Sequence, residues 1–273
     1  MRKFKSCCKI AVLITGLLIA PQLVTFADTT LVKERGYSSI ISQTDESTPA
    51  SAIDEKADEI LRQMSDFIES QQNFSFSAET ERDFLTTSGV YIQVAHEGDM
   101  VVNRPNQFWA NVTGDLVQRE FWYDGSKVTV VDTERNIYAS GDAPASMDET
   151  LDTLIQKLNV NMPLAELLYS DIYEGLTKNV EFGYYFGMSE VDGVPCHHLV
   201  FVQDSIDWQV WIEDSETPVL RKVAIAYKQR EGVPRYTAIL SDWNLKPEIT
   251  PEQFTFSPPP KAKQVEFVHA TPY

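Results

Sequence analysis

Few side chains in this sequence could carry out nucleophilic or metal chemistry. Of its four histidines, His197 and His198 are adjacent on a predicted strand, so they point to opposite faces. Cys196 and His198 share a face, and a thiol beside an imidazole can be a nucleophile or part of a metal site. No further ligand stands at a suitable spacing. We therefore expect ordinary packing of this pair rather than catalysis or metal binding.

The other familiar signs of an enzyme or a cofactor site are missing from the sequence. Its 12 glycines form neither GxGxxG nor GxxxxGK, and neither GxSxG nor HExxH occurs. The 40 Asp and Glu residues produce acidic pairs throughout the chain, so no glycosidase-like pair stands out. We interpret the acidic residues as a solvated surface. The sequence thus predicts a protein that is not an enzyme, with no catalytic residue, metal or cofactor.

One arginine stands in an unusual place. In the stretch DMVVNRPNQFW, Arg104 follows three apolar, strand-forming residues and directly precedes Pro105. Pro105 lacks an N–H and breaks the ladder of a strand, while Phe108 and Trp109 start the next one. The charged head of Arg104 therefore lies at a strand end, from which it can reach a neighbouring element. A plain turn is the alternative.

The elements that would position these residues are mostly strands. Apolar residues from Ile53 to Ile68 recur at helical spacing and predict an amphipathic helix. A meander of about six strands should follow, then two helices, then about five strands. This order predicts an α+β fold with a large antiparallel sheet and helices on one face. The expected strands of the first half cover 74–81, 89–97, 98–105, 107–113, 116–125, 127–133 and 136–140, and the expected helices between the two halves carry apolar stripes over 147–158 and 164–176.

Aromatic residues fall on both faces of the predicted sheet. Trp122 and Tyr123 are neighbours on one strand and must point opposite ways. Such a sheet needs cover on both faces, or it exposes a patch for a ligand. A core on one side with scattered surface aromatics on the other is the alternative.

The N-terminus has the pattern of a secretory signal peptide. Four Lys and Arg residues precede an apolar run from Ile10 to Ala20, and Ala27 stands at a suitable cleavage position. We expect cleavage after Ala27, with an uncleaved anchor as the alternative. Residues 28–52 are polar and weakly periodic and predict a flexible tether. The exported chain would keep only Cys196, which we expect to be buried and inert rather than redox-active.

The charge of the chain limits its partners. Removal of residues 1–27 leaves 19 Lys and Arg against 40 Asp and Glu, a net charge of −21. Such a surface repels nucleic acid and anionic lipid headgroups. We therefore expect no nucleic-acid partner, and a lipid-related role would require an apolar pocket.

Three blocks of the sequence resemble LolA, the periplasmic lipoprotein carrier. They are GDMVVNRPNQFWANV at 98–112, WYDGSKVTVVD at 122–132 and ITPEQFTFSPPPKAKQV at 249–265. The order of elements agrees as well. More narrowly, the whole chain is similar to the predicted periplasmic family known as domain of unknown function 2092, which is related to the LolA, LolB and RseB-type group.

This resemblance implies an unclosed antiparallel β-barrel, a half-barrel over residues 53–268 with helices covering its concave face and a short tail at 269–273. It also implies that Arg104 hydrogen-bonds backbone carbonyls of the helical lid and holds it closed, each bond contributing about 1.5–3 kcal/mol. We expect an apolar ligand such as acyl chains between sheet and helices. The ligand-binding residues predicted in this way are Arg104, Val102, Phe108, Trp122, Leu151, Leu154, Ile155, Leu168 and Trp208.

Two functions agree with these observations. The first is a periplasmic, non-enzymatic carrier or sensor that holds lipid or lipoprotein acyl chains in the half-barrel. The alternative is a regulatory module of the RseB type that recognises another envelope protein without transporting lipid. A third reading, an enzyme using Cys196 and His198 or a carboxylate pair, has the least support.

Overall fold

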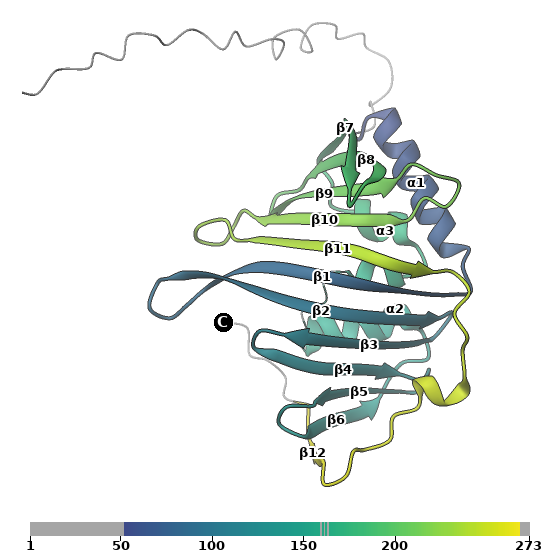
Figure 1. Cartoon of the computed structure of the whole chain (residues 1–273), viewed down its shortest axis with the longest axis vertical. Coiled ribbons are helices and arrows are strands. Elements are labelled where there is room, and N and C mark those ends of the chain that lie inside the picture. The colour runs from purple at the N-terminus through teal and green to yellow at the C-terminus, as the bar shows by residue number, and fades with distance from the viewer. Residues whose placement is uncertain (1–51, 159, 161, 163, 268–273) are drawn as a thin grey trace, which may run out of the picture. The chain divides into compact units, whose positions relative to one another are not determined.

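The computed structural model describes residues 52–158, 160, 162 and 164–267. The predicted signal peptide, all of the predicted tether before Ala52 and the predicted tail lie outside these residues. Twelve strands form one sheet in the order β12-β6-β5-β4-β3-β2-β1-β11-β10-β9-β8-β7 (Figure 1). All neighbouring strands are antiparallel except β12 and β6. None of the helices in this described part has the length and apolar character needed to cross a lipid bilayer.

The elements follow one another in two strand-rich halves separated by helices. The first half consists of α1 (Glu55–Glu69), β1 (Asn73–Leu85), β2 (Tyr91–Asn103), β3 (Gln107–Gly114), β4 (Val117–Tyr123), β5 (Lys127–Asp132) and β6 (Ile137–Asp142). The connection contains α2 (Met147–Asp152), the π-helix η1 (Thr153–Lys157), the 3₁₀-helix η2 (Ala165–Leu168) and α3 (Ile172–Thr177). The second half consists of β7 (Phe182–Val191), β8 (Val194–Val202), β9 (Ile206–Glu213), β10 (Leu220–Tyr227), β11 (Arg235–Asn244), the 3₁₀-helix η3 (Pro251–Phe254) and β12 (Lys263–Val265).

The topology explains why helices cover the sheet. The two halves meet where β1 pairs with β11, with Ala78 opposite Leu240. Strands β6 and β7 are consecutive in the chain but lie toward opposite edges of the sheet. The connection between them must therefore cross a face of the sheet, and it does so as α2, η1, η2 and α3. We call the covered face the inner face, and η2 with α3 the lid.

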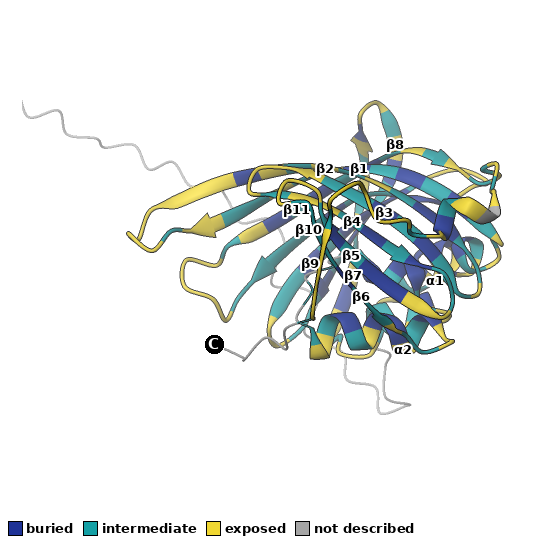
Figure 2. Ribbon diagram, turned by 90° about the horizontal axis from the view of Figure 1, so that it is seen from below, coloured by how far each residue is buried: buried dark blue, intermediate teal, exposed yellow. Residues whose placement is uncertain are grey.

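The core lies between the inner face and the helices. Alternate residues of β1 point inward, and Phe74 and Phe76 are buried there. Helix α1 begins at its N-cap Asp54, whose carboxylate accepts a hydrogen bond from the Ala57 N–H (2.8 Å), and it buries Leu61 and Met64. Buried stretches gather along the middle of the strands and on the helices, whereas the hairpin ends are exposed (Figure 2).

The predicted fold class is confirmed: the sheet is an open antiparallel half-barrel with helices on its concave face. Two local predictions were wrong. Residues 89–97 and 98–105 do not form two strands, because β2 runs through Gly98, where a Cβ would stand 2.8 Å from the Asn111 carbonyl oxygen. The expected second helix is interrupted between Leu168 and Ile172, because Asp171 caps a new helix by accepting from the Glu174 N–H (2.7 Å).

Candidate ligand-binding site

Arg104 connects the sheet to the lid. It follows the last residue of β2 and is half-buried. Its Nη1 donates hydrogen bonds to the carbonyls of Leu168 and Tyr169 (both 3.1 Å), and its Nη2 donates to the carbonyl of Leu167 (3.1 Å). One guanidinium group thus binds three consecutive carbonyls at the end of η2.

These carbonyls are available because a helix leaves its last C=O groups without intrahelical partners. A rigid guanidinium fork suits several of them at once. Burial lowers the pKa of Arg104, and the negative charges of Glu69 and Asp148 oppose that shift. The group nevertheless remains protonated at neutral pH, because the pKa of arginine starts above 12.

The lid has further polar contacts at the same end. Asp148 accepts hydrogen bonds from the Ser170 N–H (2.9 Å) and hydroxyl (2.5 Å). Glu69, at the end of α1, accepts from the N–H of Ile172 (2.6 Å). The hydroxyl of Tyr173 donates to Asp58 of α1. These hydrogen bonds join the lid to α1 and α2, while Leu167, Leu168 and Ile172 of the lid are buried in the core.

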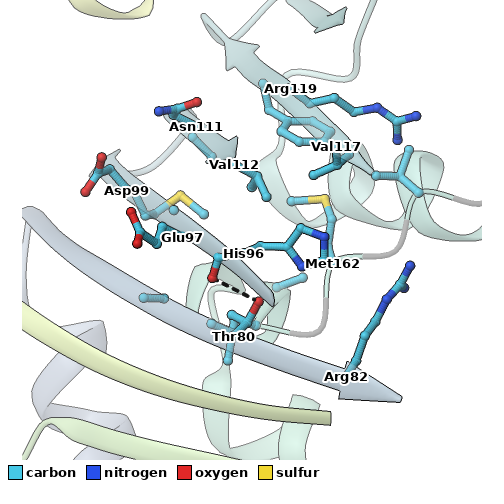
Figure 3. A pocket seen from close by; sticks show the side chains of 18 of the residues that line it. Thr80, Arg82, His96, Glu97, Asp99, Asn111, Val112, Val117, Arg119 and Met162 are labelled. Carbon is cyan, nitrogen blue, oxygen red and sulfur yellow. Dashed lines mark hydrogen bonds between the residues drawn. The ribbon is translucent and has the colours of Figure 1, made fainter. Parts of the chain in front are cut away.

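A cavity of about 350 Å³ lies between the inner face and the segment that leads into the lid. Phe76, Met100 and Phe121 line it from the sheet, and Met162 and Leu164 line it from the connection. Figure 3 shows Met162 beside Val112 and Val117, with Arg119 on one side of this group and Arg82 on the other. The cavity has the size of a small-molecule site, and apolar side chains form most of its wall.

A second cavity of about 360 Å³ lies under the lid on the other half of the sheet. Trp208, Val210 and Val223 line it from β9 and β10, and Leu176 lines it from α3. Leu164 lines both cavities, so the two spaces lie on either side of the same short segment.

The structure places most of the predicted ligand-binding residues in closed packing at the Arg104 end. Val102, Phe108, Leu151, Leu154 and Leu168 are buried in the core, and Ile155 packs against it. None of these six residues lines either cavity. Trp208 is the predicted apolar residue that does line one of them.

The structure corrects the prediction that Trp122 binds the ligand. Its neighbours Phe121 and Tyr123 belong to the inner core, so alternation along β4 turns Trp122 to the outer face. There its ring lies 6.2 Å from that of Trp109 and 6.1 Å from that of Phe256. The C-terminal segment therefore covers Trp122, and the residue has no access to the space under the helices.

The sequence did contain a signal for the residues that line the first cavity. In β1 the inward alternation that begins at Phe74 and Phe76 continues through Ala78 and Thr80 to Arg82. The prediction from sequence followed the alternation only as far as its apolar residues. It therefore missed the polar end of the cavity.

The Cys196–His198 pair lies in packing on the outer face. Cys196 is fully buried in a cluster with Val191 and Trp211, and burial raises the pKa of its thiol to about 11. His198 stacks on Trp211 with ring centroids 4.1 Å apart, and burial lowers its pKa. At neutral pH the thiol stays protonated, so it is a weak nucleophile. Among the described residues, no three His, Cys, Asp or Glu side chains are arranged to hold a metal ion.

Comparisons with solved structures show similar folds at low sequence identity. An uncharacterised conserved protein from Thermus thermophilus shares 10% identity, with a TM-score of 0.47 over 78% of this chain and 99% of that one. The lipoprotein LppX from Mycobacterium tuberculosis shares 14% identity, with a TM-score of 0.46 over 72% and 100%. A LolA superfamily protein from Nitrosomonas europaea shares 10%, with a TM-score of 0.34 over 73% and 97%.

No curated protein matches this chain. A family model does, over residues 57–268, which is nearly the whole described part of the chain. The chain therefore belongs to the family of predicted periplasmic proteins called DUF2092.

Proposed function

We propose that this protein is an exported, non-enzymatic carrier or sensor that holds an apolar ligand, acyl chains, in the space between its half-barrel and its helices. The observation that carries the proposal is the pair of apolar-lined cavities, together with the hydrogen bonds from Arg104 that hold the lid beside them. A buried apolar space within a packed core lowers stability, because its lining loses contacts. A ligand that fills the space restores those contacts.

The energy scale of the Arg104 contacts agrees with a lid that can open. A hydrogen bond to a charged group contributes about 1.5–3 kcal/mol. Filling an apolar site contributes about 25 cal/mol for each Å² of apolar surface removed from water. Burial of a single acyl chain is therefore sufficient to compensate for the loss of one or two of the Arg104 bonds.

The test is native mass spectrometry, with lipid extraction, on protein purified from its own host. We expect a fraction that carries bound lipid and an empty fraction that takes up a fluorescent fatty acid. As a control for surface adsorption, Val90→Ser, at an exposed position that lines neither cavity, should leave uptake unchanged. Protein that is always empty and never takes up the probe would exclude the proposal.

An envelope protein partner is the second candidate, and strand β7 favours it. β7 is an edge strand, and Phe182 and Phe186 on it are 48% and 66% exposed. The backbone of Ala52 and Asp54 bonds both polar groups of Gly183 (3.0 Å each) and so covers part of this edge. The Tyr185 N–H is also bonded, to the Asp54 carboxylate (2.6 Å). Beyond Tyr185, no strand of the described part lies on this side of β7, and an edge with exposed aromatics is a site where another chain can add a strand.

Photo-crosslinking in the periplasm distinguishes the two candidates. A crosslinker that replaces Phe186 should capture one stoichiometric protein if β7 is the docking site. The same crosslinker at Val90, which is exposed on the β1–β2 hairpin, serves as the matched control. Capture at both positions, or at neither, would argue against a partner at β7.

A further inference from the structure

The inner face of the sheet changes from apolar to cationic along its strands. In β1, the inward residues of the first cavity are Phe76 and Ala78, followed by Thr80 and Arg82. In β4, Phe121 is followed by Arg119 toward the same end of the cavity. Exposed Leu116 lies at the rim there, so this end opens to solvent. We call it the open end.

Arg82 lines the first cavity without a partner for its charge among the described residues. It is half-buried and lines the cavity, and its Nε is shielded from solvent without a hydrogen-bond partner. Within the described ranges, its guanidinium group forms neither an ion pair nor a side-chain hydrogen bond. The chain has a net charge of −17, so carboxylates are plentiful, yet no carboxylate of the described part pairs with Arg82. A partly buried charge without a partner is costly.

The acidic residues around this cavity are turned away or already bonded. Glu97 and Asp99 alternate to the outer face, where Asp99 accepts a hydrogen bond from the Ser77 hydroxyl (2.7 Å). Figure 3 shows both acids on the side of the strand away from Arg82. Asp115 accepts a hydrogen bond from the N–H of Ala95 (3.1 Å). Among the residues that the structure describes, the open end therefore has two guanidinium groups, Arg82 and Arg119, against one lining carboxylate that is not turned away, Asp115, whereas the whole molecule is strongly acidic.

Neighbouring phenols add neutral donors beside Arg82. Tyr236 lines the same cavity, and Tyr227 is close to it. Burial raises the pKa of both hydroxyls, and the positive charge of Arg82 opposes that shift. Both hydroxyls remain protonated at neutral pH. The negative charge of Glu166 also raises the pKa of both hydroxyls. Glu166 itself lines the second cavity. Burial raises the pKa of its carboxyl, and the positive charge of Lys178 opposes that shift.

Arg119 is the weaker of the two cations. It is exposed, and its charge helps to lower the pKa of Asp132, a carboxylate that already pairs with Arg135 (2.7 Å). Arg119 therefore has an acidic neighbour, whereas Arg82 has no ion-pair partner in the described part of the chain. The geometry makes Arg82 the inner group for an anion and Arg119 a contributor to the local field.

We infer that the ligand is an amphiphile with a single anionic head, and that Arg82 binds this head at the open end while the acyl chain lies against Phe76, Met100 and Met162. This inference rests on the proposed function and specifies its ligand class. A guanidinium fork binds both carboxylate and phosphate oxygens, so a fatty acid and a monoalkyl phosphate share the required chemistry.

The test compares an acid with its neutral analogue. Binding of cis-parinaric acid and of its methyl ester is followed by fluorescence at about pH 8, where the acid is ionised. The wild-type protein should prefer the acid by about tenfold, the scale of one charge-assisted contact. Arg82→Gln should reduce acid binding to the level of the ester and leave ester binding unchanged. Arg82→Lys should retain part of the preference, and Arg135→Gln all of it.

Competition identifies the head group. Lauric acid and dodecyl phosphate should both displace bound parinaric acid, and inorganic phosphate should not. The amphiphile that displaces parinaric acid at the lower concentration carries the preferred head group. Displacement by inorganic phosphate alone would show a simple anion site and overturn the inference.

Failure of the inference can be distinguished from failure of the proposed function. Equal binding of acid and ester by the wild-type protein, or an unchanged preference in Arg82→Gln, would overturn the role of Arg82 and leave an apolar carrier. If neither probe binds, both the inference and the proposed function fail.

Discussion

Two arginines lie near opposite ends of the β1–β2 ladder, and they differ in what the terminal nitrogens of their guanidinium groups contact. Arg104 follows Asn103, which pairs with Asn73 at one end, and Arg82 pairs with Val94 toward the other. Nine residues of strand separate the two positions, about 30 Å. Arg104 donates to three backbone carbonyls of the protein, whereas Arg82 has no side-chain partner within the described residues.

The difference separates a structural role from a binding role. Side chains around Arg104 are tightly packed, and the protein itself supplies its acceptors. Arg82 instead lines a cavity. Hydrogen-bond acceptors for its guanidinium group must therefore come from a ligand. Replacement of Arg104 should therefore change the lid, and replacement of Arg82 should change the choice of ligand.

The largest effect should come from the packed end. Leu151 is fully buried there, and Leu151→Ala should lower the free energy of unfolding by about 2–5 kcal/mol, because the surrounding core cannot collapse into the new space. Leu164 already borders both cavities. Leu164→Ala should cost under about 1 kcal/mol. Urea denaturation measures both changes, and equal losses would show that the two regions are equally packed.

Arg104→Leu should act on the lid. Arg104→Leu removes three hydrogen bonds, and even one bond to a charged group contributes about 1.5–3 kcal/mol to the closed state. Amide exchange in η2 and α3 should therefore rise by at least about ten- to a hundredfold. Arg82→Gln should leave exchange there unchanged. Hydrogen-exchange mass spectrometry provides the measurement. Unchanged exchange in the lid of Arg104→Leu, with a large drop in Tm, would instead show that Arg104 belongs to a purely structural turn.

A smaller effect should appear at low pH where the lid meets α1. Burial favours a raised pKa for Asp58, but hydrogen bonds from Tyr173 and Arg62 outweigh it and lower the pKa. A lowered folded-state pKa contributes stability that is present above about pH 4, the unfolded value, and is lost as the pH falls through the folded-state pKa.

Exchange in α3, relative to the rate of an unprotected amide at the same pH, should therefore rise on acidification in the wild-type protein. Tyr173→Phe removes the hydroxyl that donates to Asp58, so most of this rise should already be present in the variant at neutral pH. The effect is small because Asp58 is partly exposed to solvent. An identical pH profile in the two proteins would exclude this contact as the cause.

The sequence predicted the arrangement of elements better than it predicted the binding surface. Alternation in β1 and the apolar stripe of 147–158 were sufficient to place the core on one face. The same apolar signal could not separate residues in closed packing, such as Phe108 and Leu154, from residues that line a cavity, such as Met100 and Met162. That distinction depends on how far the helices stand from the sheet, which no local pattern encodes.

Two errors have simple physical reasons. Gly98 suggested a turn, but it serves to let β3 approach β2 closely. Trp122 looked like a ligand contact because it is large and apolar, but its position next to Phe121 and Tyr123 assigns it to the other face. The position of Arg104, in contrast, was informative. A charge at the end of a buried strand requires hydrogen-bond acceptors nearby, and the carbonyls at the end of η2 provide them.

The methionines allow the most direct test of the central claim, that the space under the helices holds an apolar ligand. Met100 and Met162 line the first cavity and Met64 the second, whereas Met147 is buried without lining either and Met188 is exposed on β7. NMR spectra of protein labelled with ¹³C-methyl methionine should be recorded during titration with lauric acid. We expect saturable shifts at Met100 and Met162 and none at Met188. Shifts confined to Met188, or no saturable shift at any methionine, would contradict the claim.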